Sequence, residues 1–327
     1  MKRNIAIIAG GDSGEYPISI KSASMVSAKI DPSKYNVFVI EIKGFNWIYK
    51  HPEFGNIQID KNDFSLSLGK NKIVFDLVFN LIHGSPGENG KLQGYFDLLG
   101  LPYTSSNVIS SAITFNKAYC NHIVKGNGVA VSKNMHLFKS HPVEPAEILK
   151  TINLPAFVKP NQGGSSVGMS KVNRASDLSA ALEKAFAEDD EILIEEYIKG
   201  RELTCGIFKY KNEIMRLPVT EILSKKEFFD YEAKYDKAFA DEITPADISA
   251  ELTQEIQETS AHLYRVLNCK GIVRFDYIST AEKLWFLEVN TVPGMSNESI
   301  IPQQIEAMGY SLSAFYEMII EEALRKG

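Results

Sequence analysis

The chain has 327 residues, of which 44% are hydrophobic and 23% are charged, and its formal net charge is −6. This length and composition predict a globular protein of two or three domains. Because the charges are mixed in sign along the chain, it has no basic stripe for a phosphate backbone, and we expect no nucleic-acid partner.

The cysteines and the N-terminal segment indicate the compartment. Cys120, Cys205 and Cys269 form no CxxC pair, which argues against a disulfide framework and a zinc cluster and fits a reducing environment. Gly10 and Gly11 interrupt the first apolar run far short of a signal-peptide core or a membrane span. We therefore expect a cytoplasmic protein with no membrane contact.

The first 105 residues are typical of a parallel α/β unit. The strand NIAIIAGG (4–11) ends in a glycine turn and is followed by the helix-compatible stretch ISIKSASMVSAKI (18–30). YNVFVIEI (35–42) and FDLVFNLIH (75–83) repeat the buried-strand pattern, and LQGYFDLLG (92–100) predicts a helix that stops at its glycine. Alternating strands and helices predict a parallel sheet.

Residues 106–200 predict a small α+β domain, with helices on either side of a short strand and a glycine-rich strip. The elements expected in it are helices at 116–126, 146–152 and 176–188, strands at 155–160 and 191–198, and the strip KPNQGGSSVGMSK at 159–171.

Residues 201–327 predict an antiparallel sheet with helices. Strands are expected at 202–210, 213–223, 271–279 and 283–290, a helix at 251–267, and a helical tail at the end of the chain. The charged and aromatic segment 224–248 reads as a long irregular loop, and such loops are commonly functional.

The glycine strip could bind a phosphate group. Gly163, Gly164 and Gly168 permit backbone conformations that let amide N–H groups surround an anion, and Ser165 and Ser166 add hydroxyls. The alternative is an exposed hairpin turn. The strip is not a Walker A loop, since a methionine rather than a lysine follows its last glycine.

Two strands carry a second polar pattern, RFD at 274–276 and EVN at 288–290. Alternation places Arg274 with Asp276, and Glu288 with Asn290, on one face of each strand. Their hard oxygen ligands suit magnesium beside a nucleotide, and the arginine would face the negative charge that develops there. The alternative is the solvated face of a hairpin, but apolar neighbours and the turn TVPGMS favour a site.

Two residues follow strand ends of the first unit, where ligands of open α/β sheets bind. Glu15 lies after the first glycine turn and His83 at the end of a later strand, so both could hold one small polar substrate. Alternatively, Glu15 complements a helix dipole and His83 is a structural histidine.

Six motifs in order, HGSPGENGKLQG, LGLPYTSS, KPNQGGSSVGMSKV, DYEAKY, GIVRFD and LEVNTVPGMS, resemble those of the D-alanine–D-alanine ligase family of the ATP-grasp superfamily. The resemblance spans nearly the whole chain. It implies an ATP-grasp fold of the α/β class, with an N-terminal parallel-sheet α/β domain (1–105), a small central α+β domain (106–200) and a C-terminal antiparallel-sheet domain (201–327). It also implies a homodimer through the N-terminal domain.

The resemblance implies that ATP lies between the antiparallel sheets and that the glycine strip is a mobile loop that closes over its phosphates. The ATP-binding residues would be Lys117, Lys159, Gly164, Ser166, Glu195, Glu196, Tyr197, Ile198 and Glu202. The ligands of two Mg²⁺ or Mn²⁺ ions would be Asp276, Glu288 and Asn290.

The implied reaction joins two D-alanines through an acyl phosphate and supplies a peptidoglycan precursor. Glu15 would bind the first ammonium group in a network with Ser165 and Tyr235, while Arg274 and the Gly294 N–H would stabilise the oxyanion. The other substrate-binding residues would be His83, Lys234, Ser299, which anchors the second carboxylate, and Ile300.

Tyr235 favours dipeptide synthesis over the alternatives D-alanyl-D-lactate and D-alanyl-D-serine, and the intact metal and arginine positions disfavour a non-catalytic relative. The chain departs from the usual family pattern at Tyr16–Pro17, directly after Glu15, and at Asn89, where an acidic residue is usual. Pro17 could alter the start of the helix that follows Glu15, and Asn89 removes a charge near His83.

Overall fold

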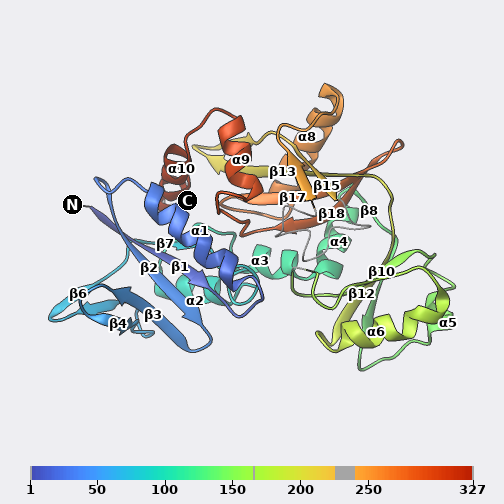
Figure 1. Cartoon of the computed structure of the whole chain (residues 1–327), viewed down its shortest axis with the longest axis horizontal. Coiled ribbons are helices and arrows are strands. Elements are labelled where there is room, and N and C mark those ends of the chain that lie inside the picture. The colour runs from blue at the N-terminus through green and yellow to red at the C-terminus, as the bar shows by residue number, and fades with distance from the viewer. Residues whose placement is uncertain (1, 165, 225–239, 326–327) are drawn as a thin grey trace.

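The computed structural model describes residues 2–164, 166–224 and 240–325 (Figure 1). An N-terminal sheet, drawn in blue, lies at one end of the molecule, and a green sheet of the middle segment lies at the other. The largest sheet is built mainly by residues 201–290, drawn in yellow to red, and residues 130–131 add a short edge strand to it. The mixed α/β class is confirmed. No helix in the described ranges is long and apolar enough to cross a membrane.

The N-terminal sheet has a parallel centre and an antiparallel edge, in the order β4-β3-β2-β1-β7. As predicted, β1 (Arg3–Gly10) pairs in parallel with β2 (Tyr35–Lys43) and β7 (Leu77–Asn80). The unpredicted strands β3 (Asn46–His51) and β4 (Gly55–Gln58) extend it in antiparallel fashion. A small hairpin of β5 (Leu66–Leu68) and β6 (Asn71–Ile73) follows.

Strand β1 explains how the ends of the chain come together. Its continuous apolar run is buried on both faces, as expected for a central parallel strand. Ile5 and Ile7 on one face share a core with Phe315 of the C-terminal helix α10 (Leu312–Leu324) and with α1 (Tyr16–Lys29), while Ile8 on the other packs with α2 (Lys91–Leu99). The last helix therefore covers the first sheet.

The middle segment forms a four-stranded antiparallel sheet in the order β11-β10-β12-β9. Its core includes residues of the two helices of this segment. The strands are β9 (Asn134–Phe138), β10 (Ala156–Pro160), β11 (Ser170–Val172) and β12 (Glu191–Glu196), and the helices are α5 (Pro145–Ile148) and α6 (Leu178–Phe186).

The largest sheet has the order β16-β15-β13-β17-β18-β8, with β14 paired to β13. All of its pairings are antiparallel except that of β18 with β8. The strands are β8 (Ala130–Val131), β13 (Arg201–Tyr210), β14 (Glu213–Arg216), β15 (Thr220–Ser224), β16 (Ala240–Ile243), β17 (Val273–Ser279) and β18 (Leu284–Asn290). The remaining helices are α3 (Val108–Phe115), α4 (Lys117–Gly126), α8 (Ala250–Val266) and α9 (Ile300–Ala307).

Two expectations for this sheet were wrong. The strand expected at 213–223 is two strands, interrupted around Pro218, whose ring nitrogen carries no hydrogen for a ladder bond. Residues 240–243, expected within an irregular loop, form β16 and pair with β15. Such a short strand is stabilised by its partner rather than by its own pattern.

The junction between the first unit and the largest sheet generates a stability prediction. Gly271 has a φ of +65°, and a methyl group there would lie 1.8 Å from the Thr104 carbonyl oxygen. Gly309 also has a left-handed φ, +88°, but nothing lies within 4 Å of the same methyl position. We expect Gly309→Ala to lower the free energy of unfolding by about 1 kcal/mol and Gly271→Ala by several times more. Chemical unfolding followed by circular dichroism measures both, and equal losses would contradict the close packing at Gly271.

Candidate active site

Two cavities meet in the middle of the molecule. The first has a volume of about 520 Å³ and the second of about 700 Å³. Arg274 and Glu288 line both, as do Glu15, Lys117 and Gly164. A ligand in one cavity can therefore meet a ligand in the other at this shared wall.

Every candidate site residue that the structure describes lines at least one cavity. The first is lined by Glu15, His83, Lys117, Gly164, Arg274, Glu288, Asn290, Gly294, Ser299 and Ile300. The second is lined by Glu15, Lys117, Lys159, Gly164, Ser166, Glu195, Glu196, Tyr197, Ile198, Glu202, Arg274, Asp276 and Glu288. Ser165, Lys234 and Tyr235 lie outside the described residues.

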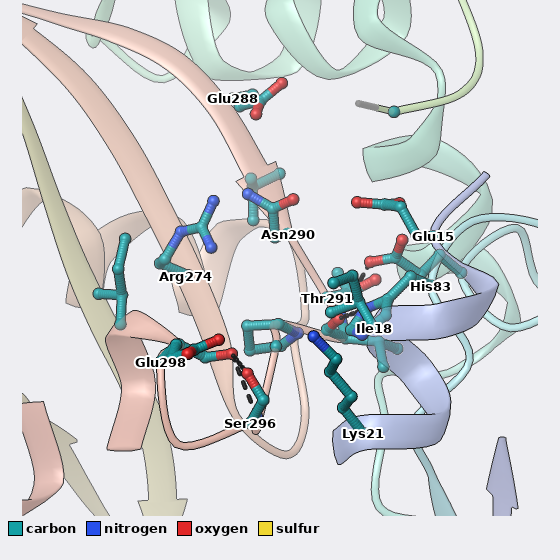
Figure 2. Close-up of a pocket in the computed structure, with 18 of the residues that line it drawn as sticks. Glu15, Ile18, Lys21, His83, Arg274, Glu288, Asn290, Thr291, Ser296 and Glu298 are labelled. Carbon is teal, nitrogen blue, oxygen red and sulfur yellow. Dashed lines mark hydrogen bonds between the residues drawn. The ribbon is translucent and has the colours of Figure 1, made fainter. Parts of the chain in front are cut away.

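The shared wall is built by the register of β17 and β18. Arg274 lies opposite Asn290, and Asp276 lies opposite Glu288, so the four side chains share one face as their alternation predicts. Figure 2 shows Arg274, Asn290 and Glu288 on adjacent strands, with Glu15 across the cavity.

Asp276 is the anchor of this wall. Its carboxylate, 3% exposed, accepts hydrogen bonds from Nε and Nη2 of Arg274, both at 2.8 Å. Nδ2 of Asn290 donates to it at 3.1 Å and the Thr204 hydroxyl at 2.5 Å. The bidentate pair fixes the plane of the guanidinium group.

The charges around Arg274 keep it protonated. Burial alone would lower the pKa of this guanidinium, but attraction to Asp276, and then to Glu288 and Glu242, raises it above its ordinary value. Arg274 is therefore a permanent cation at the point where the cavities meet, and such a cation can stabilise developing negative charge.

The floor of the first cavity comes from the N-terminal unit. Glu15 is at the N-cap position of α1, yet its side chain does not cap the helix. Its Oε2 instead lies 3.2 Å from the position that a methyl group would take on Gly164 of the glycine strip. The strip thus reaches the first helix, and capping does not explain Glu15.

His83 is buried at the same edge. Its Nδ1 lies 2.7 Å from the carbonyl oxygen of Val292, and burial lowers its pKa. Its Nε2 is also buried, and no described group forms a hydrogen bond with it. A purely structural histidine would have both nitrogens satisfied, so a ligand contact at Nε2 fits the site better.

Helix α9 closes the other side of the first cavity. Ser299 is its N-cap residue, and its Oγ accepts a hydrogen bond from the Ser296 N–H at 3.1 Å. A methyl group at Gly294 would lie 2.7 Å from this Oγ. Gly294 therefore packs directly against Ser299. No described side chain caps the N-terminus of α9, so its first backbone N–H groups can bind an anion.

The second cavity combines a buried lysine, Lys159, and a half-buried one, Lys117, with apolar walls. Lys159 pairs with Glu195 at 2.5 Å, with side chains 10% and 8% exposed, and Lys117 donates to the Gly163 carbonyl at 2.7 Å. Phe157 and Trp285 add aromatic surface. Flat apolar walls beside cations and a glycine strip suit an aromatic base with attached phosphates.

The side chain of Glu196 is held by hydrogen bonds to Asn153. Its Oε1 accepts hydrogen bonds from the backbone N–H and from Nδ2 of Asn153, at 2.9 and 2.8 Å. Its place at the cavity wall is therefore held mainly by its backbone, at the end of β12.

The departure at Tyr16–Pro17 is accommodated locally. Pro17 lies in the first turn of α1, where a missing N–H costs nothing. The Tyr16 hydroxyl donates to Glu41 at 2.5 Å, and burial followed by this bond raises the pKa of Tyr16 to about 12.

Sequence reasoning missed other polar residues of the first cavity, among them Glu88, Lys21, Glu242 and Glu298. Burial first, and then the charge of Glu15, raise the pKa of Glu88 to about 7. Its position in HGSPGENG, the motif that begins at His83, was the available signal.

The donor set at the shared wall fits a hard divalent cation. Among the described residues, no group of three His, Cys, Asp or Glu side chains is placed to bind a metal ion. The carboxylates of Asp276 and Glu288 and the carboxamide of Asn290 nevertheless lie together on the paired strands β17 and β18. Asn290 turns its Nδ2 to Asp276, so its oxygen is the atom available for a ligand. Carboxylate and amide oxygens are the ligands that Mg²⁺ prefers.

Comparisons with known proteins cover nearly the whole chain. The family model described as D-ala D-ala ligase N-terminus matches residues 4–106, and that described as D-ala D-ala ligase C-terminus matches residues 123–321. The D-alanine–D-alanine ligase of Bacteroides fragilis is 45% identical over 322 residues, covering 98% of this chain and 99% of that protein. The enzyme of Flavobacterium johnsoniae is 46% identical over 322 residues, with the same coverage.

Solved structures of ligases superpose on nearly the whole chain. The VanG D-Ala:D-Ser ligase of Enterococcus faecalis superposes with a TM-score of 0.88 at 31% identity, covering 99% of this chain and 100% of that one. The D-alanine–D-alanine ligase of Bacillus anthracis complexed with ATP has a TM-score of 0.80 at 33% identity, covering 99% of this chain and 98% of that one.

The buried pair in the second cavity generates a prediction. Lys159→Met leaves Glu195 buried without its partner, and we expect the free energy of unfolding to fall by about 3 kcal/mol or more. Replacing both residues, as in Lys159→Met with Glu195→Leu, should recover most of this loss.

The matched control is Lys133→Met, which removes a lysine 55% exposed and 3.9 Å from Glu196. We expect it to cost about 1 kcal/mol or less. Urea unfolding without ligands compares the variants, and equal losses for Lys159→Met and Lys133→Met would contradict a buried pair.

Proposed function

The chain belongs to the D-alanine–D-alanine ligase family, and from this premise we propose that it joins two D-alanines to D-alanyl-D-alanine, converting ATP to ADP and phosphate. The observation that carries the proposal is the shared wall of Arg274, Asp276, Glu288 and Asn290 between the two cavities. Such a wall lets a nucleotide phosphate meet an amino-acid carboxylate. The product would serve peptidoglycan synthesis in the cytoplasm.

Three domains contribute to this site in the proposal: 1–105 for the first substrate, 106–200 with the phosphate strip, and 201–327 with the catalytic wall. The second cavity holds ATP. Lys117, Lys159, Gly164 and Ser166 contact its phosphates, the segment 195–198 lines the adenine, and Glu202 binds the ribose hydroxyls. The apolar walls and the buried Lys159 support this assignment.

Two Mg²⁺ or Mn²⁺ ions would be held by Asp276, Glu288 and Asn290. When bound there, they would offset the charge of the phosphoryl group that is transferred. Arg274 contributes a further positive charge from this chain, kept in place by its bidentate pair with Asp276.

The first step transfers a phosphoryl group. A carboxylate oxygen of the first D-alanine attacks the γ-phosphorus, the bond from that phosphorus to the β,γ-bridging oxygen breaks, and ADP leaves. Glu15 holds the ammonium group of this D-alanine, which directs its carboxylate toward the shared wall. Positioning of this kind supplies much of the rate.

The second step forms the peptide bond. The deprotonated amine of the second D-alanine attacks the acyl phosphate, and the tetrahedral oxyanion lies between Arg274 and the Gly294 N–H. Collapse breaks the bond from carbon to the phosphate oxygen, the attacking nitrogen gives its extra proton to the departing phosphate, and the dipeptide remains. Ser299 and Ile300, at the start of α9, bind the second carboxylate.

The second substrate is D-alanine rather than D-serine or D-lactate in this proposal. The curated relatives at 45–46% identity are D-alanine–D-alanine ligases, which supports it, whereas the D-Ala:D-Ser ligase is 31% identical. Tyr235, Lys234 and Ser165, which lie outside the described residues, complete the site in the proposal.

A coupled ADP-release assay with ATP and Mg²⁺ tests the proposal. We expect ADP and D-alanyl-D-alanine, identified by mass, with D-alanine alone, and neither with L-alanine alone. ADP formation only when D-serine or D-lactate accompanies D-alanine would show that one of these, rather than D-alanine, is the second substrate. No ADP under any condition would reject the enzyme proposal. Sedimentation of the same preparation tests the proposed homodimer.

The role of Arg274 generates a second prediction. Arg274→Ala removes the cation at the oxyanion, and we expect turnover to fall about a hundredfold or more with ATP binding nearly unchanged. Arg274→Lys keeps a charge but not the bidentate fork, so it should recover only part of the rate. Steady-state rates and ATP titration calorimetry measure the two effects, and unchanged turnover in Arg274→Ala would remove Arg274 from the mechanism.

A further inference from the structure

The backbone N–H and carbonyl groups of Val292, in the C-terminal half, are both held by the loop that follows β7. The carbonyl oxygen of Val292 accepts a hydrogen bond from Nδ1 of His83 at 2.7 Å, and the N–H of Val292 donates to Oε1 of Glu88 at 3.0 Å. Oε2 of Glu88 in turn accepts from the N–H of Gly84 at 2.7 Å. We call these three hydrogen bonds the Val292 clamp.

The clamp lies directly beside the proposed chemistry. Val292 is 4% exposed and follows Asn290 on the segment that leads to Gly294. Asn290 is a proposed metal ligand, and Gly294 is the proposed oxyanion donor. A displacement of the Val292 backbone would therefore move Asn290 and Gly294 relative to the N-terminal half.

The clamp also determines which nitrogen of His83 carries the proton. A carbonyl oxygen can only accept a hydrogen bond, so the contact at Nδ1 requires a hydrogen on that nitrogen. In the neutral ring Nε2 then carries a lone pair. This buried Nε2 has no described hydrogen-bond partner, and Figure 2 shows His83 beside Glu15 at the first cavity.

Glu15 and Nε2 of His83 are both acceptors in this arrangement. An ammonium group has three N–H donors and no acceptor, so it matches two neighbouring acceptors, whereas a carboxylate does not. The first D-alanine presents such a group.

We propose that Glu88 is a positioning residue: with His83 it holds the 290–294 segment against the N-terminal loop and keeps the Nε2 lone pair of His83 aimed at the ammonium group of the first D-alanine. This inference rests on the proposed function. Glu88 itself touches no reacting atom; it acts through Val292 and His83.

Glu88→Gln tests the clamp with little change of shape. The amide group of glutamine presents N–H donors in place of one acceptor oxygen, so one of the two backbone N–H groups loses its partner. We expect kcat/KM for D-alanine to fall about tenfold to a hundredfold. The KM for ATP should change less than about twofold, since the second cavity contains no part of the clamp.

Glu322→Gln is the matched control. Glu322 also accepts a hydrogen bond from a backbone N–H of another element, that of Lys211 at 2.9 Å, but it lines neither cavity. Its kinetic constants should equal those of the unmodified protein. Thermal unfolding of each variant establishes that it is folded.

Two substitutions at His83 separate the clamp from the substrate contact. Asparagine keeps a donor near the Nδ1 position and loses the acceptor at Nε2, while glutamine can reach the Nε2 position without the Nδ1 donor. Both should weaken D-alanine use. Glu88→Gln should add only part of its effect to His83→Asn, where the hold on Val292 survives but the Nε2 acceptor is already lost, and little to His83→Gln, where one side of the clamp is already gone.

A spectroscopic measurement reads the proton position without reference to activity. In protein labelled with ¹⁵N-histidine, the resonances of His83 are identified among the six histidines by their loss in His83→Asn. We expect a protonated Nδ1 and an unprotonated Nε2 in the unmodified protein, and mixed tautomers in Glu88→Gln.

Three results would overturn the inference in a protein that makes the dipeptide: unchanged kcat/KM for D-alanine in Glu88→Gln, an equal loss toward ATP and D-alanine, or a hydrogen on Nε2 of His83. An unmodified protein that releases no ADP with D-alanine would instead reject the proposed function. The two failures are therefore distinguishable, and the tautomer measurement stands in either case.

Discussion

The bidentate ion pair of Arg274 with Asp276 is the interaction on which the site depends. It places a permanent cation on the face where the two cavities meet, and it orients the carboxylate that faces Glu288 across the strands. Thr204 and Asn290 complete the hydrogen bonds of Asp276. A buried pair of this kind contributes little net stability but defines geometry, which is what a site for charge transfer requires.

No single part of the chain makes the site. The largest sheet supplies the shared wall, the middle sheet supplies Lys159 and the glycine strip, and the first sheet supplies Glu15 and His83. The first unit and the C-terminal part are held together by the packing of α10 against the first sheet and by the hydrogen bonds that reach Val292. The order of the elements in sequence therefore matters less than the contacts between distant segments.

Much of the fold and site could be predicted from local pattern. Alternation on two strands was enough to group Arg274, Asp276, Glu288 and Asn290, because side chains on a strand repeat every second residue. The parallel centre of the first sheet followed from its continuous apolar runs. What pattern could not reveal depends on long-range partners: β16 is stabilised by β15, and the role of Glu88 depends on Val292, 204 residues away.

The central claim is that a D-alanine carboxylate attacks the γ-phosphorus of ATP at the shared wall. Supplying D-alanine labelled with ¹⁸O in both carboxylate oxygens tests it most directly, since the oxygen that bridges carbon and phosphorus leaves with the phosphate. The account predicts that each phosphate released carries one ¹⁸O atom. Phosphate without label, or label in an adenine nucleotide, would contradict an acyl-phosphate route.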